Sequence, residues 1–147
     1  MEFEVRSYDV DFAGVVSNLV YHRWMEDLRI AVMSQAFTLR EAFDQGLVPT
    51  VAQTLIDYRS PLRLGDHARG RQAITAVGVT SFVFETEMRR ARDGAVVAAA
   101  RHTVVFVNAE TGKPQPVPDA IRKLRTAPSF TIHLRGIDSP GPEGRTT

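Results

Sequence analysis

A single long helical segment followed by several strand-like segments is the feature of this sequence that most limits its fold. Residues 19–37 contain no Gly or Pro, and apolar residues recur there at spacings of three and four. After Gly46 the pattern changes to a period of two, which is typical of strands. Because strands must bury one face, and this helix is the only long apolar element available, the sequence predicts an α+β fold. In it, an antiparallel sheet wraps around a long central helix.

The other elements follow from turn and capping signals. Residues 38–45 are predicted as a short helix, because Thr38 and Glu41 form a capping box before Gly46. A second short helix is predicted over 119–125. Strands are predicted over 2–10, 48–59, 67–77, 82–91 and 95–107, with an extra strand over 129–135.

The chain length favours one domain, since 147 residues rarely bury two cores. We expect this domain to cover residues 1–128, followed by the extra strand at 129–135. The last segment, residues 136–147, is rich in Gly, Pro, Ser and charge and has almost nothing to bury. It is therefore predicted to be a disordered tail.

Composition excludes several classes of function. The chain has no cysteine, which excludes a disulfide scaffold, a Cys-ligated metal and a thiol nucleophile. Its net charge of +1 provides no field that would attract nucleic acid or an anionic membrane. The charged N-terminal segment is unlike a signal peptide, and no apolar run is long enough to span a membrane. We therefore expect a cytoplasmic location.

The inventory of reactive groups leaves one candidate site. The four histidines show no metal-ligand spacing, and no G-x-S-x-G or phosphate-binding loop is present, so we expect neither metal nor cofactor. What remains is the acidic segment Asp9–Gly14, which runs into a helix start at Ser17 and Asn18. A helix N-terminus offers free N–H groups that stabilise an oxyanion, and a nearby carboxylate can act as nucleophile or base. Alternatively, Asp9 or Asp11 merely closes a turn.

Four segments together resemble one family. Residues 9–29, DVDFAGVVSNLVYHRWMEDLR, are similar to the D-x-D-x-x-G-x-V pattern and aromatic-rich helix of hotdog-fold acyl-CoA thioesterases of the 4-hydroxybenzoyl-CoA thioesterase type. The family's Y-x-x-P-L-x-x-G-D segment corresponds to Tyr58–Asp66. Its S-F-x-F-E strand corresponds to Ser81–Glu85, and its closing strand, turn and P-x-P segment to residues 104–118. The resemblance covers about residues 3–125 and implies a hotdog thioesterase domain.

The resemblance assigns roles to individual residues. Asp11 takes the position of the catalytic carboxylate, as nucleophile or as general base for water. Asn18 takes the position whose backbone N–H helps to bind the thioester oxygen, where relatives often carry Tyr or His, and Ser17 precedes it as the helix cap. Tyr21 is a candidate to line the acyl pocket, although a place in the core explains it equally well.

The thiol carrier is less defined. Some members of the family hold the CoA phosphates with a basic cluster before the Ser-Phe strand, but residues 77–80 contain no basic residue. The residues that bind CoA are therefore unknown. Other arginines could serve, at positions 59, 63, 89, 90 and 92. Otherwise the carrier is an acyl carrier protein, which docks through surface charge.

The resemblance also implies an assembly, a homodimer or homotetramer with active sites between protomers. Two other functions stay open. One is a hotdog dehydratase or hydratase, which would use a histidine with an acid, and His22 is the nearest candidate. The other is a non-catalytic acyl-binding module, which would keep the fold without needing Asp11.

Overall fold

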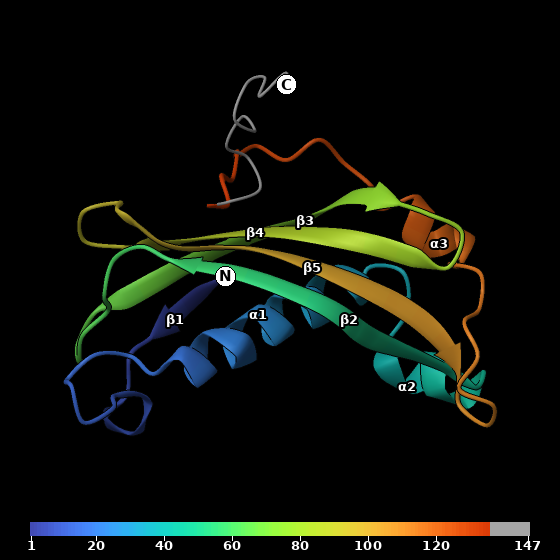
Figure 1. The fold of residues 1–147 in the computed structure, drawn as a ribbon, viewed down its shortest axis with the longest axis horizontal. Coiled ribbons are helices and arrows are strands. Elements are labelled where there is room, and N and C mark those ends of the chain that lie inside the picture. The colour runs from blue at the N-terminus through green and yellow to red at the C-terminus, as the bar shows by residue number, and fades with distance from the viewer. Residues whose placement is uncertain (136–147) are drawn as a thin grey trace, which may run out of the picture.

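A curved antiparallel sheet with one helix in its hollow dominates the computed structural model, which describes residues 1–135 (Figure 1). Its five strands lie in the order β1-β3-β4-β5-β2. Consecutive strands from β3 to β5 form a meander, and β2 and β1 take the two edges. The strands are β1 (Glu2–Glu4), β2 (Leu47–Tyr58), β3 (His67–Val77), β4 (Ser81–Arg90) and β5 (Val96–Asn108).

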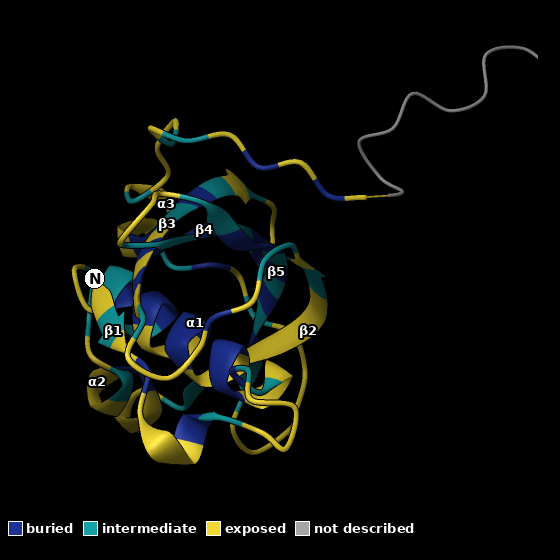
Figure 2. Cartoon of the chain, turned by 90° about the vertical axis from the view of Figure 1, so that its left-hand side faces the viewer, coloured by how far each residue is buried: buried dark blue, intermediate teal, exposed yellow. Residues whose placement is uncertain are grey.

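The long helix α1 (Asn18–Met33) lies inside the curve of the sheet with one face buried (Figure 2). Ser17 is its N-cap, as predicted. Two short helices, α2 (Leu39–Asp44) and α3 (Asp119–Arg122), flank the sheet, and the capping box predicted for α2 is present. Within residues 1–135, no helix is long and apolar enough to cross a membrane.

A glycine in β3 fixes where α1 sits across the sheet. A Cβ atom at Gly70 would lie only 2.7 Å from Cδ1 of Leu28, so the absence of a side chain allows the helix to approach β3 closely. Gly70 is paired with Met88 and shares the helix-facing side of the sheet with it. The helix is therefore displaced toward β3, away from the opposite edge strand β2.

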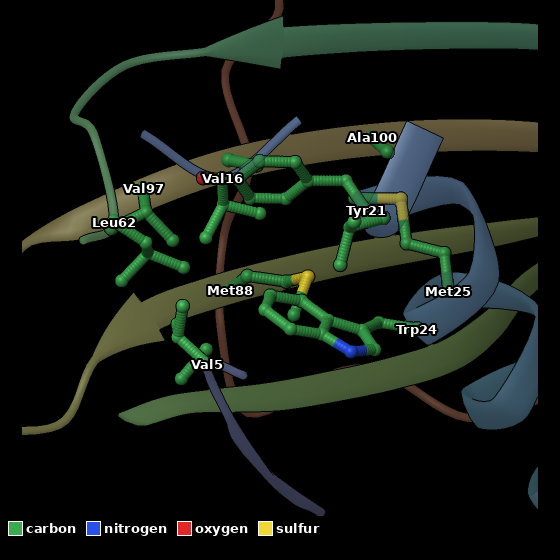
Figure 3. Close-up of a cluster of buried hydrophobic side chains, with 12 residues drawn as sticks. Val5, Val16, Tyr21, Trp24, Met25, Leu62, Met88, Val97 and Ala100 are labelled. Carbon is green, nitrogen blue, oxygen red and sulfur yellow. The ribbon is translucent and has the colours of Figure 1, made fainter. Parts of the chain in front are cut away.

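Two apolar clusters fill the space between α1 and the sheet. The first surrounds the N-terminal half of α1, where Tyr21, Trp24 and Met25 pack against Met88 (Figure 3). The second surrounds the C-terminal end of α1, where Phe82 stacks on Phe106 with ring centroids 5.5 Å apart. Burial of these large side chains is the main favourable contribution to folding.

Three predicted elements are shorter than expected, and one of them is the helix predicted over 119–125, which ends at Arg122. The first strand, predicted over 2–10, ends at Glu4, because the Asp9 carboxylate accepts a hydrogen bond from the Arg6 N–H at 2.8 Å and closes the 3-10 helix η1 (Ser7–Asp9). The helix predicted over 19–37 ends at Met33, and the chain then turns so that Phe37 packs on Phe106. The other four strands and α2 match their predicted bounds to within two residues.

The extra strand predicted over 129–135 is wrong. This segment runs across the face of the sheet opposite α1 rather than along an edge, so it cannot form a ladder of backbone hydrogen bonds (Figure 1). It is held instead by side chains: Ile132 and Leu134 pack on Ala99, and the Arg71 guanidinium lies over the Phe130 ring. The predicted disordered tail, residues 136–147, lies outside the described residues.

Candidate active site

A small hairpin places the predicted catalytic carboxylate just before α1. Val10 and Val16 pair as an antiparallel bridge, and the Asp11 N–H donates to the Val15 carbonyl at 2.9 Å. Gly14 closes the turn with a φ of +78°, a conformation that favours glycine. A turn is therefore present in the acidic segment, as the alternative interpretation of the sequence expected, and the hairpin leads directly into the helix cap.

Asp11 lies exposed at the tip of this hairpin. Its Oδ1 accepts a hydrogen bond from the Ala13 N–H at 2.9 Å, which is a turn-closing role. The second carboxylate oxygen has no partner among the described residues. The neighbouring Phe12 is fully exposed to solvent. Closing the turn thus leaves one oxygen of Asp11 free for chemistry.

Asp9 has a different environment from Asp11, although the two acids are only two residues apart. Asp9 is 4% exposed, and its carboxylate accepts from the Arg6 N–H and lies 3.5 Å from Nη2 of Arg23. Its carbonyl oxygen accepts from the Ser17 N–H at 2.9 Å. Asp9 therefore joins η1 to the start of α1 and has a structural role.

Replacement of Asp9 by alanine is expected to lower the free energy of unfolding by about 1.5–3 kcal/mol, the usual contribution of hydrogen bonds to a charged group. Urea denaturation measures this loss. Asp27→Ala, an exposed acid on α1, is the matched control and should change stability by about 0.5 kcal/mol at most. Equal stability of the two variants would contradict the structural role of Asp9.

The first turn of α1 has free backbone donors. The Leu19 N–H reaches Ser17 Oγ only at 3.4 Å, which is a long hydrogen bond. The Asn18 N–H makes no hydrogen bond with any residue in the range 1–135. Both Asn18 and Leu19 are exposed. A carbonyl or carboxylate oxygen can therefore bind at this helix end.

Tyr21 lies in the core. It is 3% exposed, and its ring packs edge-on against both Trp24 and Tyr58, with centroids 5.7 and 5.3 Å away. Burial, with a smaller contribution from Tyr58, raises the pKa of its hydroxyl to about 12. The hydroxyl therefore stays neutral at physiological pH.

Backbone pairing sets the spacing between the two halves of the site. Asp9 lies opposite Ser17 and Asp11 lies opposite Val15, so Asn18 follows the position facing Asp11 by three residues. At the rise of an extended chain, three residues correspond to about 10 Å. The structure thus brings Asp11 and the helix start to the same end of α1.

Two buried polar side chains, one on α1 and one on β5, were not singled out by the sequence analysis. His102 is 1% exposed and Arg29 is 9% exposed, and both lie between the two apolar clusters. His102 Nδ1 and Arg29 Nη1 have no hydrogen-bond partner in the described part of the chain. The alternation of β5 offers a signal, since it puts His102 on the same face as Ala100 and Val104. A histidine at such a position must be buried.

The stability of the protein is expected to fall as pH decreases from about 6.5 to about 4. Burial, followed by the charges of Arg29 and His22, lowers the pKa of His102 from 6.5 to about 4. As the pH falls, His102 is therefore protonated in the unfolded chain before it is protonated in the folded protein. This difference lowers the free energy of unfolding by up to about 3 kcal/mol across that range.

Urea denaturation at several pH values measures the free energy of unfolding of wild type and of His102→Asn. The loss of stability between about pH 6.5 and pH 4 that comes from His102 should be absent in this variant. His133→Asn, at an exposed histidine, is the matched control and should lose stability with falling pH as wild type does. If His102→Asn depends on pH in the same way as wild type, His102 is not the source of this loss of stability.

Most of the arginines considered for the carrier phosphates are engaged in ion pairs. Arg90 pairs with Asp93 at 2.9 Å, and Arg92 pairs with Asp66 at 2.9 Å. Arg59 and Arg89 pair with Asp57 and Glu87 in the same way. No ion pair of Arg63 occurs within the described part of the chain. Each of these four arginines already has a carboxylate partner, so its position is explained without a bound phosphate. The residues that bind CoA therefore stay undefined.

The fold and the sequence agree with known thioesterases. The thioesterase-like superfamily matches residues 5–124, which is most of the chain. A 1,4-dihydroxy-2-naphthoyl-CoA thioesterase from Synechocystis is similar at 23% identity and a TM-score of 0.76, over 84% of this chain and 95% of that one. A gentisyl-coenzyme A thioesterase is similar at 24% identity and a TM-score of 0.75, over 83% and 98%. A Staphylococcus aureus protein in complex with CoA gives 15% identity and a TM-score of 0.79, over 89% and 87%.

The curved sheet around one helix is a hotdog fold, which confirms the predicted architecture. The chain belongs to the thioesterase-like superfamily, and its class is that of a thioester hydrolase. The resemblance to hotdog thioesterases seen in the sequence is thereby confirmed.

Proposed function

We propose that this protein hydrolyses an acyl thioester of CoA to a free acid and a thiol, with Asp11 as the catalytic carboxylate. The observation that carries the proposal is the position of Asp11, exposed on a hairpin that leads directly into the free N–H groups of α1. A carboxylate and an oxyanion site are the two components that thioester hydrolysis requires. The family match supports the reaction class.

Two routes suit this geometry. As a nucleophile, the free Asp11 oxygen attacks the thioester carbonyl carbon, the thiolate leaves, and water hydrolyses the resulting anhydride. As a general base, Asp11 takes a proton from water, which attacks the same carbon, and the thiolate leaves with a proton. In both routes the carbonyl oxygen becomes negatively charged and is stabilised by the N–H groups of Asn18 and Leu19.

The carrier in this proposal is CoA, which the S. aureus neighbour holds in its structure. An acyl carrier protein stays the alternative carrier, because no free basic cluster for CoA phosphates stands before β4. Ser17 acts here by fixing the start of the helix, and Tyr21 supports the site from the core.

We also propose a homodimer or homotetramer, located in the cytoplasm as the sequence predicts. Apolar side chains next to the site are open to solvent: Tyr8 is 77% exposed, Phe12 104% and Leu19 73%. The edge strand β2 is twelve residues long, and its residues 50–54 are exposed. Unpaired edges and apolar patches of this kind favour association with a second copy. A mass of one chain in sedimentation equilibrium would contradict this assembly.

A panel of acyl-CoA thioesters, followed by release of free thiol, tests the function. Turnover of at least one substrate is expected. Turnover of none, with binding retained, would identify an acyl-binding module instead. Hydration of an enoyl-CoA without thiol release would favour the hydratase alternative, for which the exposed His22 on α1 is the available histidine.

A further inference from the structure

A polar stripe runs along α1 from the proposed oxyanion site. Asn18, His22, Glu26 and Arg29 recur at helical spacing, so they share one side of the helix. Arg29 and Glu26 line a cavity together with Val51 of β2 and Val104 of β5, which shows that this side faces the β2 edge. The charge of His22 acts on the buried His102 of β5, which places His22 on the same side.

Arg29 is a buried cation that has no anionic partner among the described residues. Its side chain forms no ion pair within residues 1–135, and its Nη1 has no hydrogen-bond partner. Glu26 lies close enough for its charge to act on Arg29, but not close enough to form an ion pair. A guanidinium withdrawn from water without a partner is costly, and a carboxylate is the group that matches its geometry.

The surroundings of Arg29 define what kind of anion fits. The cavity has a volume of about 150 Å³, and most of its walls are apolar, formed by Met33, Pro49, Val51 and Val104 among others. A doubly charged diphosphate would not fit here, because the cavity offers a single cation, Arg29, beside the acid Glu26 and apolar walls. A hydrocarbon chain that ends in a single carboxylate matches both the walls and the charge.

We infer that the acyl group hydrolysed by this protein carries a terminal carboxylate, which binds to Arg29 in the cavity between α1 and β2. The inference rests on the proposed function, because the stripe leads from the thioester end of the site at Asn18 to Arg29. Eleven residues of helix separate the two, a distance of about 16 Å along the axis. The buried His102 of β5 lies near this side of α1, since the charge of Arg29 acts on it, and its Nδ1 has no hydrogen-bond partner within residues 1–135.

Hydrolysis of matched substrates tests the inference. Paired acyl-CoA thioesters of equal chain length differ only in the terminal carboxylate. The series runs from suberoyl-CoA with octanoyl-CoA to tetradecanedioyl-CoA with tetradecanoyl-CoA, because an extended chain of about fourteen carbons spans the separation of Asn18 and Arg29 along the helix. In wild type, kcat/KM is expected to favour the carboxylate-ended member of the best pair by about ten- to a hundredfold. Arg29→Gln should abolish this preference, and Arg29→Lys should restore part of it.

The matched control is Arg40→Gln, at an exposed arginine of α2, which should keep the wild-type preference. Equal rates for both members of every pair in wild type would overturn the inference. A loss in Arg29→Gln that is the same for both members, or that accompanies dissociation of the oligomer, would also overturn it. Such results would mean that Arg29 supports the fold or binds a carboxylate of a second copy.

Binding of non-hydrolysable thioether analogues separates this inference from the proposed function. If wild type hydrolyses no thioester, the proposed function fails, but calorimetry with the two analogues still decides the inference. Tighter binding of the carboxylate-ended analogue, lost in Arg29→Gln, would support it. Equal binding of the two analogues would overturn it.

Discussion

Replacement of Asp11 by asparagine is expected to lower kcat by about 10²–10⁴-fold on any thioester that the wild type hydrolyses, the range typical of a lost general base. Asparagine keeps the turn, because its Oδ1 can accept the hydrogen bond that the Ala13 N–H now donates to Asp11. The variant therefore removes the charge and the nucleophile without removing the hairpin. Thiol release under saturating substrate measures the loss.

The stability of this variant should match that of wild type to within about 0.5 kcal/mol, because Asp11 is exposed. Asp44→Asn, at an exposed acid of α2, is the control and should retain full activity. Hydrolysis by Asp11→Asn at the wild-type rate would exclude Asp11 as the catalytic carboxylate. A loss of activity together with unfolding would point to a structural role instead.

Phe82→Ala is expected to destabilise the protein by about 3–5 kcal/mol, the usual cost of truncating a buried aromatic side chain. Phe82 is completely buried, stacks on Phe106 at 5.5 Å and meets the edge of Phe84 at 5.3 Å. Its removal leaves a cavity in the second apolar cluster, which the surrounding strands cannot fill by moving. Urea denaturation with a constant m-value measures the effect.

The neighbouring Val83 provides the control, because it lies on the same strand but is only partly buried. Val83→Ala should cost well under half as much as Phe82→Ala. A loss below about 1 kcal/mol for Phe82→Ala would mean that the second cluster repacks, which its stacked rings argue against.

The parts of the fold that could be predicted are those with regular hydrophobic patterns. The period-two pattern of Phe82 and Phe84 identified β4, and the capping box of Thr38 identified α2. The extra strand at 129–135 was wrong because alternation cannot distinguish a strand from a segment that lies flat on a sheet. Only the position of the segment in space makes that distinction, and it depends on contacts such as that of Ile132 with Ala99.

The candidate site was predictable to a similar degree. The acidic hairpin and the helix start are local features, so the sequence could indicate Asp11, Ser17 and Asn18. The distinction between exposed Asp11 and buried Asp9 depends on the packing of η1. Arg29 lies beside Val51 and Val104, which are far from it in the sequence. No local pattern could therefore predict that these residues line one cavity.

The segment after α3 also has a consequence for how copies of this protein can meet. Residues 130–134 cover the outer face of the sheet, where Phe130 and Leu134 lie near Arg71 and Ala99. A back-to-back arrangement of two sheets would have to displace these contacts first. The edge strand β2 and the exposed apolar tip around Phe12 stay open to association, and the tip adjoins Asp11 of the proposed site. In the proposed homo-oligomer, the end of the chain covers one side of the sheet, so a second copy would meet the side that carries the proposed catalytic Asp11.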